Sequence, residues 1–440
     1  MTEMEIRLVL RFREPENGFT VNGILQGLEE QTPVIIKAIL EQIFKALEER
    51  AIMRLRREKP GRYVLNGHQR NARKLITHFG PFHYRMAQMV DTQTGKTIVP
   101  SARELELTPY RQYQAEAMEA GVGLAIHLSF AQASREVIRI RGSGPSKSTT
   151  YPWFREISRA HGVWPEMKEI PYRFLMVDGT KVHLQGPGGV DLGKKEMRWA
   201  LASLGPGHKF EPVEFWIGKG WAEIRKDLDR RLTYAKLEVL FSDGGAGIAE
   251  NLLAKGMRQQ RCLWHGKRDF PFVLYADKIK QAEQEPFRSL FDKISVFSLT
   301  QGRLEEVDPD DIQTIRDLAE NTCKGFEQLL EVLDQNKYPK ARTYLNNLYC
   351  HTMTFLNYWL TTQHWIPLNI NAIESAFSRI ANRIKNVGKR WSDQGLLAWL
   401  MLALRKIFKP ELWTELWDQY LKINRKMDLI LCHSEYAWIQ

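Results

Sequence analysis

The spacing of apolar side chains near the N-terminus predicts two helices followed by a hairpin. Val21–Leu28 has the pattern of a short helix and Thr32–Ala51 that of a longer one, because apolar positions recur at helical intervals. Met53–Leu65 carries a Pro-Gly pair near its centre, which is typical of a β-turn. This order favours a winged helix-turn-helix. An amphipathic helix followed by a solvated basic loop explains the pattern equally well.

A second candidate for a helix-turn-helix follows. The pattern predicts a helix over Pro109–Ile138, a glycine-containing break at Arg141–Pro145, and a helix over Ser146–Ala160 that begins with hydroxyl side chains. Such a second helix would enter a major groove of DNA. An ordinary helical hairpin is the alternative, because the same pattern describes it.

From Pro171 the pattern changes to short apolar runs separated by glycine and proline, which predict strands. The expected strands are Tyr172–Val177, Trp199–Leu204, Val213–Ile217, Leu237–Phe241 and Arg261–Trp264, with helices at Ala222–Leu232 and Ile248–Lys255. Residues from Gln281 onwards are predicted to be mostly helical. Strands first and helices later indicate an α+β or α/β fold with a mixed sheet.

These changes of pattern predict several domains. The expected divisions are a winged-helix-like DNA-binding candidate at 1–75, a helical region with the second helix-turn-helix candidate at 76–170, a mixed-sheet core at 171–280 and 366–410, a helical insertion at 281–365, and a C-terminal helical tail at 411–440. A chain of 440 residues with 43% hydrophobic content can fill more than one core.

The charge balance points to a polyanionic partner. Lys and Arg number 63 against 52 Asp and Glu, a formal net charge of +11, and such an excess attracts phosphates. The surplus is local, and the candidate nucleic-acid-binding residues in the predicted hairpin are Arg54, Arg56, Arg57, Lys59 and Arg62.

The cysteine pattern and the lengths of the apolar runs bear on the cellular compartment. The cysteines are scattered without a Cys-x-x-Cys pair, which fits reduced thiols. No secretory pattern opens the sequence, and the longest apolar run, Gly395–Leu404, is too short to cross about 30 Å of hydrocarbon. We therefore expect a cytoplasmic protein without a membrane partner.

Two predicted strands end in Asp-Gly, at Asp178 and Asp243. If these strands are neighbours, their carboxylates meet at one edge of the sheet. Carboxylate oxygens suit Mg²⁺ or Mn²⁺, which are hard cations. Taken singly, each Asp is more often a turn residue than a ligand.

Glu374 supplies a third carboxylate. It borders the apolar stripe of a predicted helix, where a side chain can point into a cleft while being held rigidly. The alternative is a first-turn acid that only stabilises the helix dipole. The opposite face carries a polar and basic line that would suit a DNA backbone: Arg379, Arg383, Asn386 and Arg390.

Four motifs in this order resemble a known family. They are Val177–Thr180, Phe241–Gly244, Cys262–His265 and Asn371–Glu374, the last followed by Arg383 and Trp391. The stretch Tyr172–Phe408 is similar to DDE transposases of bacterial and archaeal insertion sequences of the Mutator-like superfamily, which have an RNase H-like catalytic core interrupted by a helical insertion.

The resemblance implies a function. Asp178, Asp243 and Glu374 would hold two Mg²⁺ or Mn²⁺ ions for phosphodiester hydrolysis and transesterification, and His265 would lie near the scissile phosphate or shape the site. Double-stranded DNA, as terminal repeats and target, would be the partner, bound by a homodimer or larger assembly in the prokaryotic cytoplasm at the nucleoid. Beside the site, the expected DNA contacts are Arg379, Arg383, Lys389, Arg390 and Trp391.

Other interpretations stay open at this point. An RNase H-like nuclease would share the carboxylates, and a domesticated DNA-binding protein would keep the fold without catalysis. Cys262 and His265 would form an ordinary packed and hydrogen-bonded pair if they have no role in the site.

Overall fold

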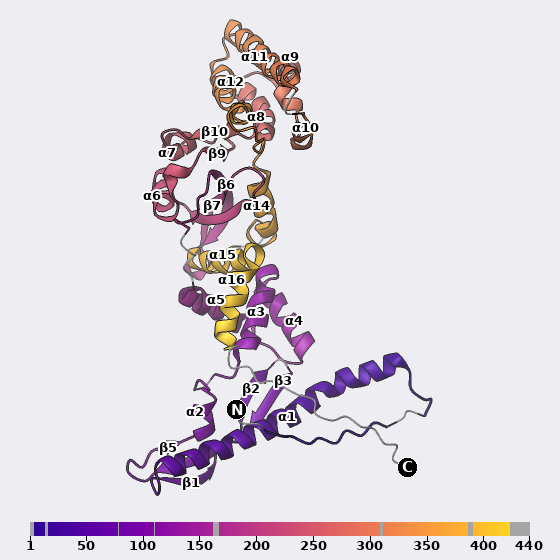
Figure 1. Ribbon diagram of the computed structural model, residues 1–440, viewed down its shortest axis with the longest axis vertical. Helices are drawn as coiled ribbons and strands as arrows, with labels where there is room; N and C mark the ends of the chain where they lie inside the picture. The colour runs from indigo at the N-terminus through magenta and orange to yellow at the C-terminus, as the bar shows by residue number, and fades with distance from the viewer. Residues whose placement is uncertain are drawn as a thin grey trace. The chain divides into compact units, whose positions relative to one another are not determined.

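The computed structural model describes residues 4–13, 16–77, 79–109, 111–161, 167–308, 311–385 and 390–422. Within these ranges helices and strands are mixed, so the predicted α+β class is confirmed (Figure 1). The chain divides into two compact units, Met1–His161 with Lys409–Gln440, and Gly162–Phe408.

The first unit combines helices with two small antiparallel sheets. Its helices are α1 (Val21–Glu58), α2 (Pro100–Glu104), α3 (Ala115–His127), α4 (Phe130–Arg141), α5 (Lys147–His161) and α16 (Pro410–Leu421). Its strands are β1 (Tyr63–His68), β2 (Arg73–Thr77), β3 (Gly80–Tyr84), β4 (Ala87–Asp91) and β5 (Thr97–Ile98), ordered β1-β4-β5 and β2-β3.

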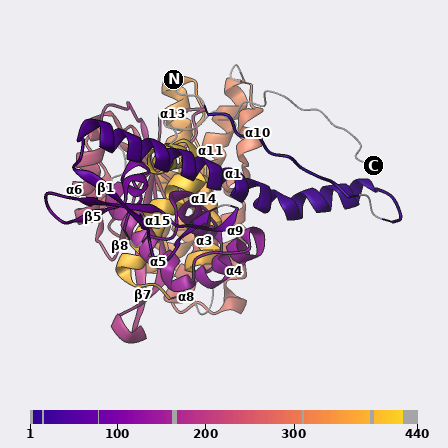
Figure 2. The same cartoon turned by 90° about the horizontal axis from the view of Figure 1, so that it is seen from below.

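The two helices predicted near the N-terminus are one, α1, which Figure 2 shows as a single long element. Residues 29–31 between the predicted helices are Glu, Glu and Gln, which favour helix. The helix continues through Pro33, and the preceding Thr32 hydroxyl donates to the Leu28 carbonyl at 2.7 Å. The predicted boundary was therefore wrong.

The hairpin predicted over Met53–Leu65 is also wrong. Helix α1 continues to Glu58, because Met53–Glu58 consists of strong helix formers. Strand β1 begins at Tyr63 and pairs with β4 rather than with the preceding residues. A hairpin does follow, between β2 and β3.

The helix predicted over Pro109–Ile138 is two helices, α3 and α4. A capping box formed by Ser129 and Gln132 begins α4, since each side chain accepts a hydrogen bond from the other residue's backbone N–H. Helix α4 ends at Gly142 in the left-handed conformation, and α5 follows it. The break expected at Arg141–Pro145 is present. The break between α3 and α4, at Leu128 and Ser129, was not predicted.

The second unit is built on a five-stranded mixed sheet with the order β10-β9-β6-β7-β8. The strands are β6 (Phe174–Gln185), β7 (Asp191–Ser203), β8 (Glu211–Ile217), β9 (Val239–Ser242) and β10 (Arg258–Arg261). Strands β6, β7 and β8 form an antiparallel meander, whereas β9 runs parallel to β6 and β10 parallel to β9.

Two predicted strand ends need correction. Strand β6 does not stop at Asp178, because Asp178 and Gly179 pair with Trp199 and Arg198 of β7 and the ladder continues to Gln185. The strand expected at Arg261–Trp264 ends at Arg261, and a helix starts at Leu263.

Helices cover the sheet and form the insertion. They are α6 (Trp221–Arg231), α7 (Ile248–Leu252), α8 (Leu263–Ala276), α9 (Glu285–Asp292), α10 (Gln301–Glu305), α11 (Ile312–Gln335), α12 (Pro339–Thr352), α13 (Thr354–Thr362), α14 (Asn371–Ile384) and α15 (Asp393–Phe408), with short 3-10 turns η1 (Pro187–Gly189), η2 (Tyr234–Lys236), η3 (Gln281–Glu283) and η4 (Ser295–Ser298). Helices α6 and α7 lie on one side of the sheet and α14 on the other (Figure 1). Among the described residues, no helix is long and apolar enough to span a bilayer.

Candidate active site

The register between β6 and β9 sets two carboxylates side by side. The strands are parallel, and Met176 pairs with Phe241. Asp178 and Asp243 each lie two residues beyond that pair, Asp178 within β6 and Asp243 just after the end of β9. The residues that precede each acid, Phe174–Val177 and Val239–Ser242, are buried, whereas Asp178 and Asp243 are partly exposed.

Asp178 bears the electrostatic consequence of this arrangement. Burial raises the pKa of its carboxyl to about 7, and repulsion from Asp243 and then Glu374 adds to the effect. A hydrogen bond from the Gly179 N–H and the charge of Lys385 act in the opposite direction. Asp243 and Glu374 therefore lie close enough to Asp178 for their charges to disfavour ionisation of that one carboxyl group.

Asp243 is held in a tight turn after β9. Its Oδ1 accepts the Gly245 N–H at 2.8 Å, and its carbonyl accepts Arg261 Nη2 at 2.9 Å. Gly244 has φ +81°, and a Cβ there would lie 2.1 Å from Arg261 Nε. The turn thus requires glycine for both its backbone conformation and the close passage of the arginine.

Glu374 enters from helix α14, across the helical insertion. Phe377, one turn further along, packs its ring against Trp199 of β7 at 5.4 Å between centroids, which fixes α14 on the sheet. The loop before the helix is fastened to α8, because Asn369 Oδ1 accepts the Trp264 N–H at 3.0 Å. Glu374 is in the first turn, and its side chain is 36% exposed.

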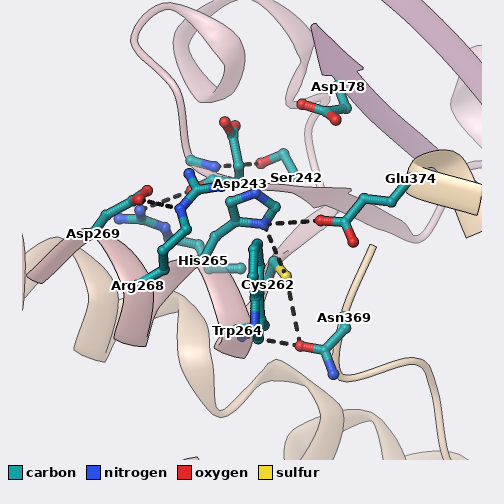
Figure 3. A network of polar contacts seen from close by, with 12 residues as sticks. Asp178, Ser242, Asp243, Cys262, Trp264, His265, Arg268, Asp269, Asn369 and Glu374 are labelled. Carbon is teal, nitrogen blue, oxygen red and sulfur yellow. Dashed lines mark hydrogen bonds and ion pairs between the residues drawn. The ribbon is translucent and has the colours of Figure 1, made fainter. Parts of the chain in front are cut away.

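His265 joins the first turn of α8 to this carboxylate. Its Nδ1 lies 3.4 Å from Glu374 Oε1 and 3.2 Å from Cys262 Sγ, and its side chain is only 7% exposed (Figure 3). The Cys262 thiol donates in turn to Asn369 Oδ1 at 3.5 Å. Because the Cys262 thiol uses its proton for Asn369, its sulfur can accept from His265, and we assign the proton to Nδ1. Burial lowers the pKa of His265, which favours the neutral ring.

The donor set has the chemistry that a divalent cation prefers, with carboxylate oxygens from within β6, from the turn after β9 and from the first turn of α14. Figure 3 draws Asp178, Asp243 and Glu374 in one close-up with His265 between the last two. Their mutual repulsion is the effect that a bound cation would relieve. Among the described residues, however, no three His, Cys, Asp or Glu side chains lie close enough together to hold an ion. The residues fit a divalent cation by type, and the structure does not gather their side chains into a metal-binding group.

The basic line predicted on α14 is not a single surface. Arg383 is buried, with its guanidinium 5.1 Å from the Trp391 ring and 5.9 Å from that of Trp399. Burial lowers the pKa of Arg383 to about 10. Trp391 is buried as well, and its Nε1 donates to the Arg383 carbonyl at 2.8 Å. The prediction that these two side chains contact DNA is corrected, because guanidinium and indole stack on one another inside the unit.

The remaining members of that line differ in their surroundings. Arg379 is exposed, donates to the Ile407 carbonyl at 2.6 Å and lies over the Phe408 ring. Arg390 is exposed and lies 3.5 Å from Asp191. Asn386 and Lys389 fall outside the described residues.

The basic residues near the N-terminus belong to the end of α1 rather than to a hairpin. Arg56 and Arg57 are exposed in its last turn, and Lys59 is its exposed C-cap. Arg54 pairs with Glu104 at 2.9 Å. Arg62 makes a two-pronged contact with Asp91, at 3.1 and 2.7 Å, and so supports the β1–β4 sheet.

Sequence reasoning missed four residues of the site. Arg261 supports the Asp243 turn, Asn369 joins α14 to α8, and Trp264 with Arg268 borders His265. For Arg261, Trp264 and Asn369, proximity in the chain to Cys262 or Glu374 was a usable signal. The sequence did not indicate which neighbour each of the four side chains would contact.

A family described as "Uncharacterised protein family (UPF0236)" matches residues 14–190, less than half of the chain. That range includes Asp178 and excludes Asp243 and Glu374. No curated protein matches the sequence.

Proposed function

We propose that this chain is a DDE transposase, which cleaves DNA strands at the ends of an insertion sequence and joins them to a target in a Mg²⁺- or Mn²⁺-dependent reaction. The observation that carries the proposal is the parallel pairing of β6 with β9, which ends two residues before Asp178 and Asp243, together with the electrostatic influence of Asp243 and Glu374 on Asp178. The mixed sheet, with acids on adjacent central strands, is compatible with the RNase H-like core that the sequence resemblance implies.

Each residue has a defined task under this proposal. Asp178, Asp243 and Glu374 would hold the two divalent ions. When bound, such ions activate the attacking water or 3′-hydroxyl and stabilise the leaving oxygen. His265 orients the Glu374 carboxylate through Nδ1, and Arg261 keeps the Asp243 turn in place. DNA would be held by solvent-facing basic residues such as Arg56 and Arg57.

A supercoiled plasmid carrying the DNA that flanks the gene tests the proposal. The full chain with Mg²⁺ should nick at the element ends and join them to a target. Asp243→Asn should abolish cleavage and keep end binding, whereas Asp229→Asn, which alters an exposed carboxylate of α6 paired with Arg225, should cleave normally. Cleavage without joining would indicate a nuclease, and end binding without cleavage by the unaltered chain would rule out both enzymes.

A further inference from the structure

Trp264 stands out beside the candidate active site. It is the only tryptophan among the described residues that is largely exposed, at 54%. Trp359, Trp391 and Trp399 are buried, and Trp365 is half-buried. Covering a solvent-exposed indole with another flat apolar group is favourable, because it removes apolar surface from water.

The indole is held in a fixed position. Its own backbone N–H is bonded to Asn369, and the His265 ring meets it nearly at right angles, at 88° and 4.8 Å between centroids (Figure 3). The Arg268 guanidinium lies 5.0 Å from the ring centroid. A prepositioned aromatic side chain loses little conformational entropy when a ligand stacks on it.

The location links this indole to the carboxylates. His265 touches Trp264 on one side and Glu374 on the other, at 3.4 Å from Nδ1 to Oε1. Arg268 is close enough to interact electrostatically with Asp243 and Glu374. An exposed ring with an adjacent cation therefore lies one side chain away from the carboxylates.

Resting on the proposed function, we propose that Trp264 and Arg268 form a stacking site for one unpaired DNA base next to the phosphate that is cut. Any nucleobase can stack on an indole, and a guanidinium can hold the neighbouring phosphate. Arg268 is now paired with Asp269 at 2.6 Å, an exposed contact that a phosphate can replace. The site would make the enzyme prefer ends whose terminal base is frayed or flipped.

The test uses the full chain without metal, so that no cleavage occurs. The probe is an oligothymidine that carries one 2-aminopurine, whose fluorescence falls when it stacks. We expect binding with quenching, an affinity about 10-fold weaker and no quenching for Trp264→Ala, and near-normal behaviour for Trp264→Phe. Arg268→Gln should weaken binding while keeping part of the quenching.

Phe272→Ala is the matched control, because Phe272 is an exposed aromatic residue, at 72%, on the same helix α8. Its binding should equal that of the unaltered chain. Thermal unfolding of Trp264→Ala should be unchanged, and Trp264→Phe and Arg268→Gln carry the test if it is not. Failure of the unaltered chain to bind the probe, or normal quenching by Trp264→Ala, would overturn the inference. Cleavage by Asp243→Asn would instead overturn the proposed function and leave the stacking site standing.

Discussion

Nδ1 of His265 lies 3.4 Å from Oε1 of Glu374, although the helical insertion separates them in sequence. The contact brings together the two ends of that insertion at a carboxylate that the proposed mechanism requires. Because His265 is buried and also touches Cys262, its ring has little freedom to turn away. We infer that it sets the direction of the Glu374 side chain.

Replacing His265 should therefore weaken metal binding. We expect His265→Ala to lower the affinity for Mn²⁺ by about 10- to 100-fold, as removal of a group that orients a ligand usually does. His265→Asn, which can still donate one hydrogen bond, should recover part of the affinity. Electron paramagnetic resonance of free Mn²⁺ measures this, with His364→Ala, at an exposed histidine, as control. Equal affinities for His265→Ala and the control would refute the positioning role.

Asp178 makes metal-free stability depend on pH. Its pKa is raised from 3.8 to about 7, so the folded state binds the extra proton in that window. The free energy of unfolding should fall as pH rises from about 4 to about 7, by at most about 4 kcal/mol. Asp178→Asn should then be more stable than the unaltered chain near pH 8 and similar to it near pH 4. Urea unfolding in EDTA would disprove this if the difference were equal at both pH values.

Gly244 should tolerate no side chain. Gly244→Ala combines a φ of +81° with a collision against Arg261, so we expect stability to fall by about 1–3 kcal/mol and cleavage activity to disappear. Gly256→Ala is the control, because it has a similar φ of +86° with nothing within 4 Å. Denaturant unfolding compares the two. If both variants are destabilised equally, backbone strain alone accounts for the effect and the contact with Arg261 is unimportant.

The end of α1 should bind DNA through phosphates. Replacing Arg56, Arg57 and Lys59 with Ala should reduce the salt dependence of DNA affinity by about 0.9 for each phosphate that is no longer neutralised, without changing the unfolding midpoint. Arg62→Ala should instead leave the salt dependence unchanged and lower the unfolding midpoint, since Arg62 pairs with Asp91. Fluorescence anisotropy at several salt concentrations distinguishes these effects. A triple variant with an unchanged salt slope would remove this surface from the interface.

Local patterns predicted much of the sheet. The apolar runs located β8, β9 and the start of β6, and helical periodicity located α6 and α14. The predicted ends of elements were wrong where contacts with other parts of the fold determine where an element stops. Strand β6 continues past the Asp178-Gly179 turn signal because β7 pairs with it. Strand β10 stops before Cys262 because the Leu368 carbonyl accepts the Leu263 N–H, which is where α8 begins.

The site was harder to foresee than the fold. Sequence motifs singled out Asp178, Asp243, Glu374 and His265, but a periodic basic line on α14 could not reveal that Arg383 turns inward. That burial depends on Trp391 and Trp399, which lie in a later loop and helix. Similarly, the exposure of Trp264 depends on how the segments around α8 pack, which no local pattern encodes.

Iron-directed cleavage tests most directly whether the three acids form one metal site, because it requires no knowledge of the DNA. Fe²⁺ takes the place of Mg²⁺, and with ascorbate and peroxide it cuts the polypeptide near the bound ion. The account predicts cuts near Asp178, Asp243 and Glu374 that excess Mg²⁺ suppresses and that Asp243→Asn abolishes. Cuts confined to other segments, or an unchanged pattern in Asp243→Asn, would contradict it.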